Sequence, residues 1–211
     1  MHRIMKLGAL GAMVVAALPA AAHAIISWGN DTGSTSLFSW AGGYSNNGLF
    51  GDPVVSSNSF TFAPPAFTAT NPGSPTATDT IQVTITVQPG QQITDVLVSE
   101  IGTRSSTNRT TVQGTLRIKD LTVGSLTDIT NSLGYVNDTT TTPIGWTGSV
   151  TTSSLGFGGG VSFQLTLTNN LSALLSGQSI TKTGVVITFL PTPGVLAGMG
   201  MAGLALTRRR R

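Results

Sequence analysis

The feature that most constrains the fold is a period-two alternation of apolar and polar residues. In segments 81–87 (IQVTITV) and 161–168 (VSFQLTLT), every second residue is apolar and most residues between them are polar. Successive side chains of a β-strand point to opposite faces, so this pattern is typical of strands with one buried face. Weaker strands are predicted at 59–63, 93–100, 111–119 and 184–190. Asn-Gly, Asp-Pro and Pro-Gly turn signals between these segments indicate antiparallel pairing.

The strand pattern predicts an all-β domain over residues 25–190. Two antiparallel sheets that bury their alternating apolar faces would form a β-sandwich of the jelly-roll or immunoglobulin-like type. A solenoid is the competing architecture, but no repeat of about 20 to 50 residues is visible. Helical spacing of leucines occurs only at 169–176, before Gly177, where a turn or two of helix is expected.

Missing residue types restrict the chemistry of the domain. The 211-residue chain has no cysteine, and its two histidines, His2 and His23, precede the predicted domain. A Cys nucleophile, a Ser-His-Asp relay and a thiolate or imidazole metal site are therefore excluded for residues 25–190. This region holds five basic and eight acidic residues, a net charge of −3, so nucleic-acid binding through phosphate contacts is not expected.

The N-terminus has the organisation of a secretory signal peptide. A short basic segment is followed by a 12-residue apolar run, 7–18, and by the small-x-small motif of Ala22 and Ala24. The run is shorter than the roughly 20 residues that cross a bilayer. Residues 1–24 are therefore predicted to direct secretion, and signal peptidase is expected to cleave after Ala24.

The C-terminus carries a second tripartite pattern. Pro191, Thr192 and Pro193 precede an apolar, glycine-containing run, and the chain ends with four arginines, Arg208–Arg211. An apolar helix followed by a basic cluster holds a chain in the membrane, with the arginines on the cytoplasmic side. Residues 195–206 would span only about 18 Å as a helix, against a hydrocarbon core of about 30 Å. This short C-terminal hydrophobic helix suits transient insertion in the inner membrane.

Together, these end segments resemble the PEP-CTERM sorting signal of Gram-negative bacteria. Pro191 and Pro193 match the two prolines of the family, and Thr192 stands where the family usually has Glu. The resemblance covers about the last 21 residues, 191–211. It implies recognition by an exosortase-like enzyme that removes the tail, and an association with exopolysaccharide and biofilm. A permanent C-terminal tether is the alternative for a tail with this variant motif.

The composition of residues 25–190 favours a structural surface protein. Thr contributes 31 and Ser 21 of these 166 residues. Threonine suits pleated sheets, and its hydroxyl can remain hydrated on an outer face or bind a neutral polymer. We therefore expect a non-enzymatic protein without cofactors, secreted to the cell surface or extracellular matrix, with exopolysaccharide as a candidate partner.

Two other functions are kept open. A carbohydrate-binding module would use aromatic rings or calcium, and Trp40 and Trp146 are the candidates for stacking on sugars. No metal ligand set is predicted. A glycan-active hydrolase would need two convergent carboxylates, and the candidates are Asp31, Asp52, Asp79, Asp95, Glu100, Asp120, Asp128 and Asp138. Most of them lie beside turn residues, and Asp95 and Glu100 are predicted to face opposite sides of one strand.

Overall fold

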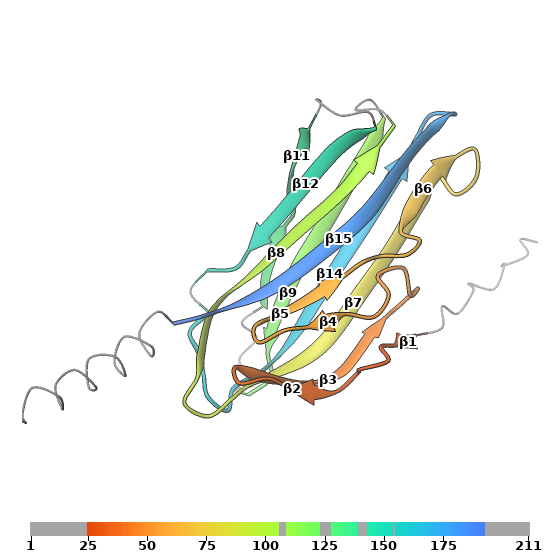
Figure 1. Cartoon of the computed structure of the whole chain (residues 1–211). Helices are drawn as coiled ribbons and strands as arrows, with labels where there is room; N and C mark the ends of the chain where they lie inside the picture. The colour runs from red at the N-terminus through yellow and green to blue at the C-terminus, as the bar shows by residue number, and fades with distance from the viewer. Residues whose placement is uncertain (1–24, 106–108, 123–127, 139–142, 154, 193–211) are drawn as a thin grey trace, which may run out of the picture.

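The computed structural model describes residues 25–105, 109–122, 128–138, 143–153 and 155–192. They form two antiparallel sheets, which confirms the predicted all-β class (Figure 1). The signal-peptide and apolar-tail predictions lie outside the described residues. Within the described part of the chain, no helix is long and apolar enough to cross a membrane.

Sheet A has the order β1-β3-β7-β14-β9-β10, with β2 added beside β3. Its strands are β1 (Ile26–Ser27), β2 (Gly33–Ser34), β3 (Phe38–Ser45), β7 (Thr76–Val87), β9 (Thr110–Asp120), β10 (Asp128–Ser132) and β14 (Ser162–Ala173). The two best sequence patterns, 81–87 and 161–168, are neighbours at its centre. Leu165 pairs with Val83, so their apolar faces coincide.

Sheet B has the order β11-β12-β8-β15-β5-β4, with β13 beside β8 and β6 beside β15. Its strands are β4 (Val54–Val55), β5 (Ser59–Phe62), β6 (Thr68–Asn71), β8 (Gln92–Arg104), β11 (Gly134–Asp138), β12 (Ile144–Thr151), β13 (Phe157–Gly158) and β15 (Gln178–Pro191). The four weaker predicted strands are thus present as β5, β8, β9 and β15.

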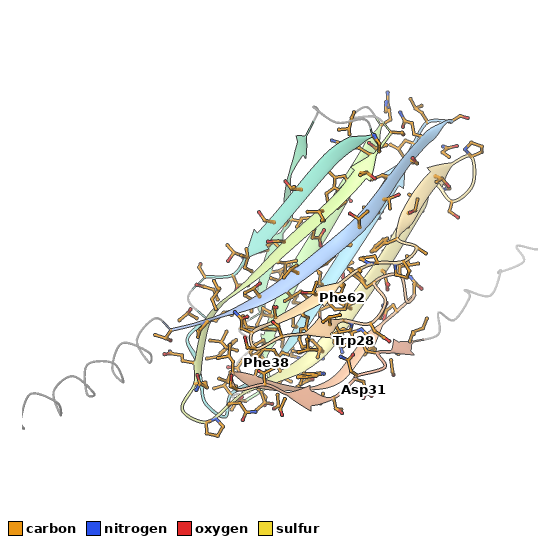
Figure 2. All side chains as sticks on the ribbon, viewed as in Figure 1. Trp28, Asp31, Phe38 and Phe62 are labelled. Atoms are coloured by element: carbon orange, nitrogen blue, oxygen red, sulfur yellow. The ribbon has the colours of Figure 1, made fainter. Side chains whose placement is uncertain are left out.

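The two sheets share one core between their inward faces. Phe38 of β3 and Phe163 of β14 contact Phe189 of β15 across the sheets, with ring centroids 4.5 and 6.3 Å apart. Trp28 and Phe62 pack against each other in the same core, with ring centroids 5.4 Å apart (Figure 2). This two-layer packing of antiparallel sheets is that of a β-sandwich.

The predicted helical segment 169–176 is wrong. Strand β14 continues to Ala173, and the chain then turns through Ser176 and Gly177 into β15. Residues 169–172 pair with β7 on one side and with β9 on the other, and Ala173 pairs with β9. The sheet therefore satisfies the backbone groups of this segment. Leu171 lies in the core, whereas Leu174 and Leu175 are exposed, so the leucine spacing does not mark one helical face.

Among the strands that have no counterpart in the predictions, β3 and β12 are the longest. The alternation along β3 is interrupted by a register shift between Ala41 and Tyr44. In β12 the inward positions include Gly148, which has no side chain to reveal a buried face. Both strands nevertheless bury a tryptophan, Trp40 in β3 and Trp146 in β12.

Candidate functional site

Three polar side chains meet inside the apolar core. Lys182 comes from β15, Glu100 from β8 and Asn169 from β14, and each has at most 1% of its surface exposed. Charged side chains are almost never fully buried unless they are paired. This cluster is therefore the most unusual chemical feature of the sandwich.

The lysine amine is the centre of the cluster. Nζ of Lys182 contacts Oε2 of Glu100 and Oδ1 of Asn169, so it bridges the two sheets. Within the described part of the chain, the other polar atom of each partner, Oε1 of Glu100 and Nδ2 of Asn169, has no hydrogen-bond partner. A buried polar atom without a partner costs about 1 to 3 kcal/mol, so the cluster is not an optimised set of hydrogen bonds.

Aromatic rings surround the amine. The Nζ atom lies 5.8 Å from the ring centroid of Phe50, 5.6 Å from that of Phe67 and 5.5 Å from that of Trp146. Such rings attract a cation through their electron-rich faces, but they cannot hydrate it. The amine therefore lies in an apolar chamber, where its hydrogen-bonding contacts within the described part of the chain are a carboxylate and a carboxamide.

Burial changes the protonation of this lysine. Desolvation lowers the pKa of Lys182 from its usual value of 10.5, and the charge and hydrogen bond of Glu100 partly oppose that effect. The loss of hydration penalises the ammonium form more than the neutral amine. A neutral amine has a free lone pair and is a nucleophile, which an ammonium ion is not.

A local irregularity of β15 turns Lys182 into the core. The register with β8 shifts between Lys182 and Gly184, so both Lys182 and Val185 face inward although three positions separate them. Lys182 pairs with Gly102 of β8. The indole of Trp146 fills the space above Gly102 and donates a hydrogen bond of 3.2 Å to the carbonyl of Thr181.

A second buried cation lies further along the inward face of β8. Arg104 is 2% exposed, and its Nη1 atom donates to the carbonyl of Thr110 at 3.2 Å and to the Thr110 hydroxyl at 3.3 Å. These contacts hold the start of β9 against the end of β8. Arg104 thus has a structural partner at the start of β9.

The stacking hypothesis for Trp40 and Trp146 requires correction. The two side chains are 9% and 1% exposed and belong to the core. Nε1 of Trp40 donates to the carbonyl of Asn30 at 2.9 Å, and Nε1 of Trp146 is bonded to Thr181. Sugar stacking needs an accessible ring face, which neither indole offers, because cross-strand glycines let both rings sink into the sheets.

Asp79, one of the carboxylate candidates, has a structural role. Asp79 is 1% exposed and accepts the Ser45 hydroxyl together with the backbone N–H groups of Asn47 (2.9 Å), Leu49 (2.7 Å) and Thr80 (2.7 Å). It therefore holds the loop that follows β3. With the Phe50 N–H at 3.3 Å, five donors occupy this carboxylate, which is poorly suited to proton transfer with a substrate.

The other acidic candidates are dispersed. Asp52 accepts the Gly29 N–H at 3.0 Å, and Asp120 accepts the Thr122 N–H at 2.7 Å, which are local turn contacts. Asp95 faces outward on β8, while Glu100 faces the core, as the sequence predicted. Asp128 and Asp138 lie in β10 and β11. Among the described residues, no group of three His, Cys, Asp or Glu could hold a metal ion.

The structure shows the beginning of the predicted sorting motif. Pro191 ends β15 and pairs with Ile93, and Thr192 follows it. Thr192 donates its backbone N–H to the carbonyl of Gln92 at 3.2 Å and its hydroxyl to Oε1 of Gln92 at 2.7 Å. The remaining sorting and cleavage residues lie outside the described part of the chain: Ala22, Ala24, Pro193, Arg208, Arg209, Arg210 and Arg211.

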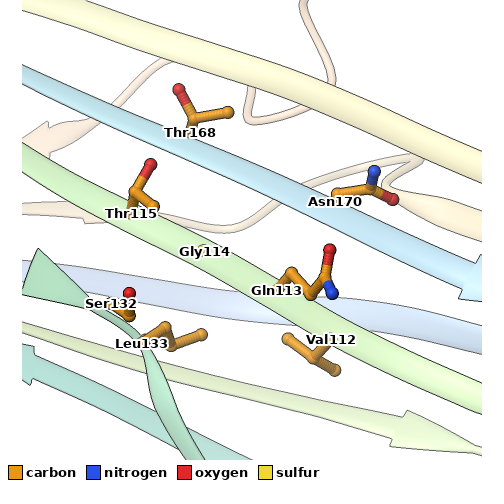
Figure 3. A pocket seen from close by; sticks show the side chains of 8 residues that line it. All are labelled: Val112, Gln113, Gly114, Thr115, Ser132, Leu133, Thr168 and Asn170. Atoms are coloured by element: carbon orange, nitrogen blue, oxygen red, sulfur yellow. The ribbon is translucent and has the colours of Figure 1, made fainter.

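The outer face of sheet A has a shallow hollow of about 500 Å³. Figure 3 shows it crossing β9 and β14, beside the end of β10. Its polar lining consists of neutral side chains, namely Gln113, Thr115, Ser132, Thr168 and Asn170. Gly114 lies at the middle of this lining. The hollow can accept hydrogen-bonding groups of an uncharged ligand.

The sequence analysis did not predict the buried cluster, although the alternation pattern indicated that two of its three residues face the core. Glu100 follows Val96 and Val98 in the same phase, and Asn169 follows Leu165 and Leu167. The predicted strand 93–100 already contains Glu100, and extending segment 161–168 by one residue would have placed Asn169 on its buried face. Lys182 is different. If the alternation of residues 185–189 is continued toward the N-terminus, Lys182 is expected to face outward, and it faces inward because the register shifts between Lys182 and Gly184.

No protein-family model matches the chain, and no curated protein matches it. Among solved structures, the enzymatically active domain of tailspike protein 4 from bacteriophage CBA120 aligns with 75% of this chain and 21% of its own, at a TM-score of 0.24 and 13% identity. A structure of the infectious bursal disease virus Gt strain aligns with 75% of this chain and 53% of its own, at a TM-score of 0.20 and 15% identity. The chain thus spans about a fifth of the first and half of the second.

Proposed function

We propose that this protein is a secreted, non-enzymatic structural component of a bacterial cell surface or extracellular matrix rich in exopolysaccharide. Residues 1–24 direct export and are removed by signal peptidase after Ala24. Residues 191–211 then hold the chain in the inner membrane of a Gram-negative cell until an exosortase-like enzyme acts at the Pro191-Thr192-Pro193 motif. Residues 25–190 are the cargo that this process delivers.

The observation that carries the proposal is the hydroxyl-rich outer surface of the sandwich. Thr80 and Thr168 face each other across β7 and β14 with their hydroxyl oxygens 3.0 Å apart, and the hydroxyls of Thr86 and Ser162 are 2.8 Å apart on the same strands. Uncharged hydroxyls hydrogen-bond neutral polymers without electrostatic steering. Such a surface supports packing in a polysaccharide matrix rather than recognition of a charged partner.

The join between the cargo and the sorting motif also supports the proposal. Strand β15, which ends at Pro191, lies between β8 and β5 in sheet B, and Thr192 is bonded to Gln92. The first residue of the motif is therefore the last residue of β15, with no linker between them. This position is consistent with a folded cargo held close to the membrane while its tail is processed.

Of the two sandwich types expected, the strand order favours a jelly-roll-like arrangement. The long strands β7, β8 and β9 alternate between the two sheets, as do β12, β14 and β15. The connections from β7 to β8, from β8 to β9 and from β14 to β15 therefore cross from one sheet to the other.

The experiment that tests the sorting proposal compares three forms of the protein in the native host. These are the wild type, a Pro191→Ala, Pro193→Ala double variant and a control variant, Pro89→Ala, in the exposed β7–β8 turn. We expect wild type and control in the matrix, lacking residues 1–24 and about 20 C-terminal residues, as read by intact mass. The double variant should stay in the membrane fraction.

A different outcome would reject the sorting mechanism. If wild-type protein keeps Arg208–Arg211 and remains in the membrane, the tail is a permanent tether and no exosortase-like enzyme acts on it. If the double variant is processed like the wild type, the proline motif is not what the sorting enzyme recognises.

The neutral hollow favours a carbohydrate-binding module as a second candidate function. Gln113 is exposed at its rim, and its amide can both donate and accept hydrogen bonds, as sugar hydroxyls do. We expect Gln113→Ala to weaken retention on the host exopolysaccharide, while Gln82→Ala on the same outer face leaves retention unchanged. Equal retention of all three forms would remove this candidate.

A glycan-active hydrolase stays the third candidate. It would need two of the eight acidic residues to converge, and the contacts of Asp79, Asp52 and Asp120 assign these three to local structure. Turnover of a glycan that a single Asp95→Asn change abolishes would support this function over the structural one.

A further inference from the structure

We propose that the side chains of Lys182 and Asn169 join in an intramolecular amide cross-link between β15 and β14, with Glu100 as the catalytic residue that transfers the proton. The cross-link would be a modification of the mature protein, formed without an external enzyme. The inference rests on the buried cluster alone and is independent of the proposed secretion and sorting.

The geometry places the two reacting groups together in advance. The Nζ atom of Lys182 already contacts the carboxamide of Asn169 through Oδ1, and the carboxylate of Glu100 contacts the same Nζ atom. All three side chains are held by central strands of two packed sheets, β8, β14 and β15. Fixing a nucleophile beside its target can replace a bimolecular encounter by an effective concentration of about 10⁵ to 10⁸ M.

The environment supplies the nucleophile. Water cannot hydrate an amine enclosed by Phe50, Phe67 and Trp146, so the uncharged form is favoured over the ammonium ion. The lowered pKa of Lys182 agrees with this expectation. The proton that leaves Nζ has an acceptor in contact with it, namely Oε2 of Glu100.

The reaction balances without an oxidant, a metal or a cofactor. The lone pair of Nζ attacks Cγ of Asn169 and forms the new N–C bond. The bond between Cγ and Nδ2 then breaks, and Glu100 passes the proton taken from Nζ to the departing Nδ2. One amine and one carboxamide become a secondary amide and ammonia, and Glu100 returns to its starting state.

The unpartnered atoms of the cluster also fit this reaction. Nδ2 of Asn169 is a buried donor without an acceptor among the described residues, and it is the atom that would leave as ammonia. The alternative without a covalent bond is a buried Lys182–Glu100 ion pair with an additional hydrogen bond to the Asn169 carboxamide. Such pairs often contribute little to stability because desolvation offsets the attraction, and this one would leave Nδ2 and Oε1 unsatisfied.

The test is mass spectrometry of the purified full-chain protein with its termini read from the same peptide map. We expect the intact mass to be lower than the mass for those termini by about 17 Da, the mass of one ammonia. The decisive observation is a branched peptide that joins the segment containing Asn169 to the segment containing Lys182. Trypsin should fail to cleave after Lys182.

Variants assign the roles. Asn169→Ala removes the electrophile and Glu100→Gln removes the proton acceptor with little change of shape, so both should show the unshifted mass and no branched peptide. Asn170→Ala is the matched control, because it removes the neighbouring outward amide of β14. It should keep the full cross-link.

The alternatives give distinguishable results. A succinimide, for example at Asn47-Gly48, also loses ammonia, but its peptides stay linear and Lys182 stays cleavable. A wild-type protein with linear Asn169 and Lys182 peptides would overturn the proposal whatever the variants do. A branched peptide in Glu100→Gln at the wild-type level would overturn the role of Glu100.

Discussion

The indole of Trp146 occupies the space where Gly102, its direct cross-strand partner, has no side chain. A Cβ atom added to Gly102 would lie 2.4 Å from Cε2 and Cζ2 of the ring and 2.1 Å from the carbonyl oxygen of Thr181. The glycine therefore lets Trp146 close one wall of the chamber that contains Lys182. A ring packed on a cross-strand glycine also restores burial that the glycine alone cannot supply.

The other two tryptophans show the same relationship. A Cβ on Gly43 would lie 2.1 Å from Cε3 of Trp28, and one on Gly33 would lie 2.3 Å from Cζ2 of Trp40. Each glycine thus provides the space in which an indole ring packs over the backbone. Glycine-rich segments that resemble loops in the sequence are strands here because tryptophan covers them.

Gly102→Ala is expected to destabilise the protein by about 1 to 3 kcal/mol, because the added methyl must displace both the indole and a backbone carbonyl. Urea unfolding followed by tryptophan fluorescence measures this change. The matched control is Gly158→Ala, where no described atom lies within 4 Å of the added Cβ. Equal unfolding midpoints for the two variants would contradict the steric explanation.

Asp79→Asn is expected to lower the free energy of unfolding by about 1 to 3 kcal/mol. The amide nitrogen that replaces one carboxylate oxygen cannot accept from the N–H groups that Asp79 now holds, and it leaves buried donors unsatisfied. Chemical denaturation gives the value. Asp31→Asn, at a half-buried position (Figure 2), should change stability by no more than about 0.5 kcal/mol. A similar effect at both positions would refute a special role for Asp79.

Asn169→Ala is expected to lower stability by more than the loss of a buried amide. The proposed link closes a segment in which the two residues are 13 positions apart, and closing a loop of about 15 residues constrains the unfolded chain by about 3 kcal/mol in the entropy model. Differential scanning calorimetry of wild type, Asn169→Ala and Asn170→Ala measures it. If the melting temperature of Asn169→Ala matches that of Asn170→Ala, the link does not stabilise the fold.

The pH dependence of stability should also separate the linked and unlinked forms. In Asn169→Ala, Lys182 keeps its amine, and burial lowers its folded pKa below 10.5. The unfolded chain then binds more protons between the lowered pKa and 10.5, so the free energy of unfolding of the variant rises with pH through that window. Glu100 is the charged contact of Nζ, and Phe50, Phe67 and Trp146 around it are uncharged.

In the wild type the linked nitrogen is an amide and does not titrate, so this contribution should be absent. Lys119, the arginines and the tyrosines are common to both proteins, and their contributions cancel in the comparison. Denaturant unfolding at several alkaline pH values provides the two slopes. Parallel slopes would mean that Lys182 titrates alike in both proteins and would count against the cross-link.

The strand assignments show what alternation can and cannot reveal. Segments 81–87 and 161–168 were predicted and are the middle of β7 and β14, because their apolar faces are continuous. Strand β12 was not predicted, since Gly145 and Gly148 leave gaps in its pattern. Its membership in sheet B depends on pairing with β8 and on Trp146 over Gly102, and both contacts join residues distant in the sequence.

The candidate site divides in the same way. The sequence predicted that Glu100 and Asp95 lie on opposite faces of one strand, and the structure confirms this. Its partners could not be identified, because Asn169 comes from the other sheet and Lys182 faces the core only through the register shift in β15. The stacking role of Trp40 and Trp146 failed because ring exposure depends on what crosses the ring in three dimensions.

The order of amino acids alone was enough to establish an all-β domain without cysteine or histidine chemistry, since periodicity and composition are local properties. It also carries the two terminal patterns from which secretion and sorting are predicted, because such signals are linear. Only the tertiary structure decided which residues meet. A strand exposes or buries a side chain according to its register, and a one-residue shift at Thr183 reverses the facing of everything before it. That shift brings the amine of Lys182 to Glu100 and Asn169 inside the core.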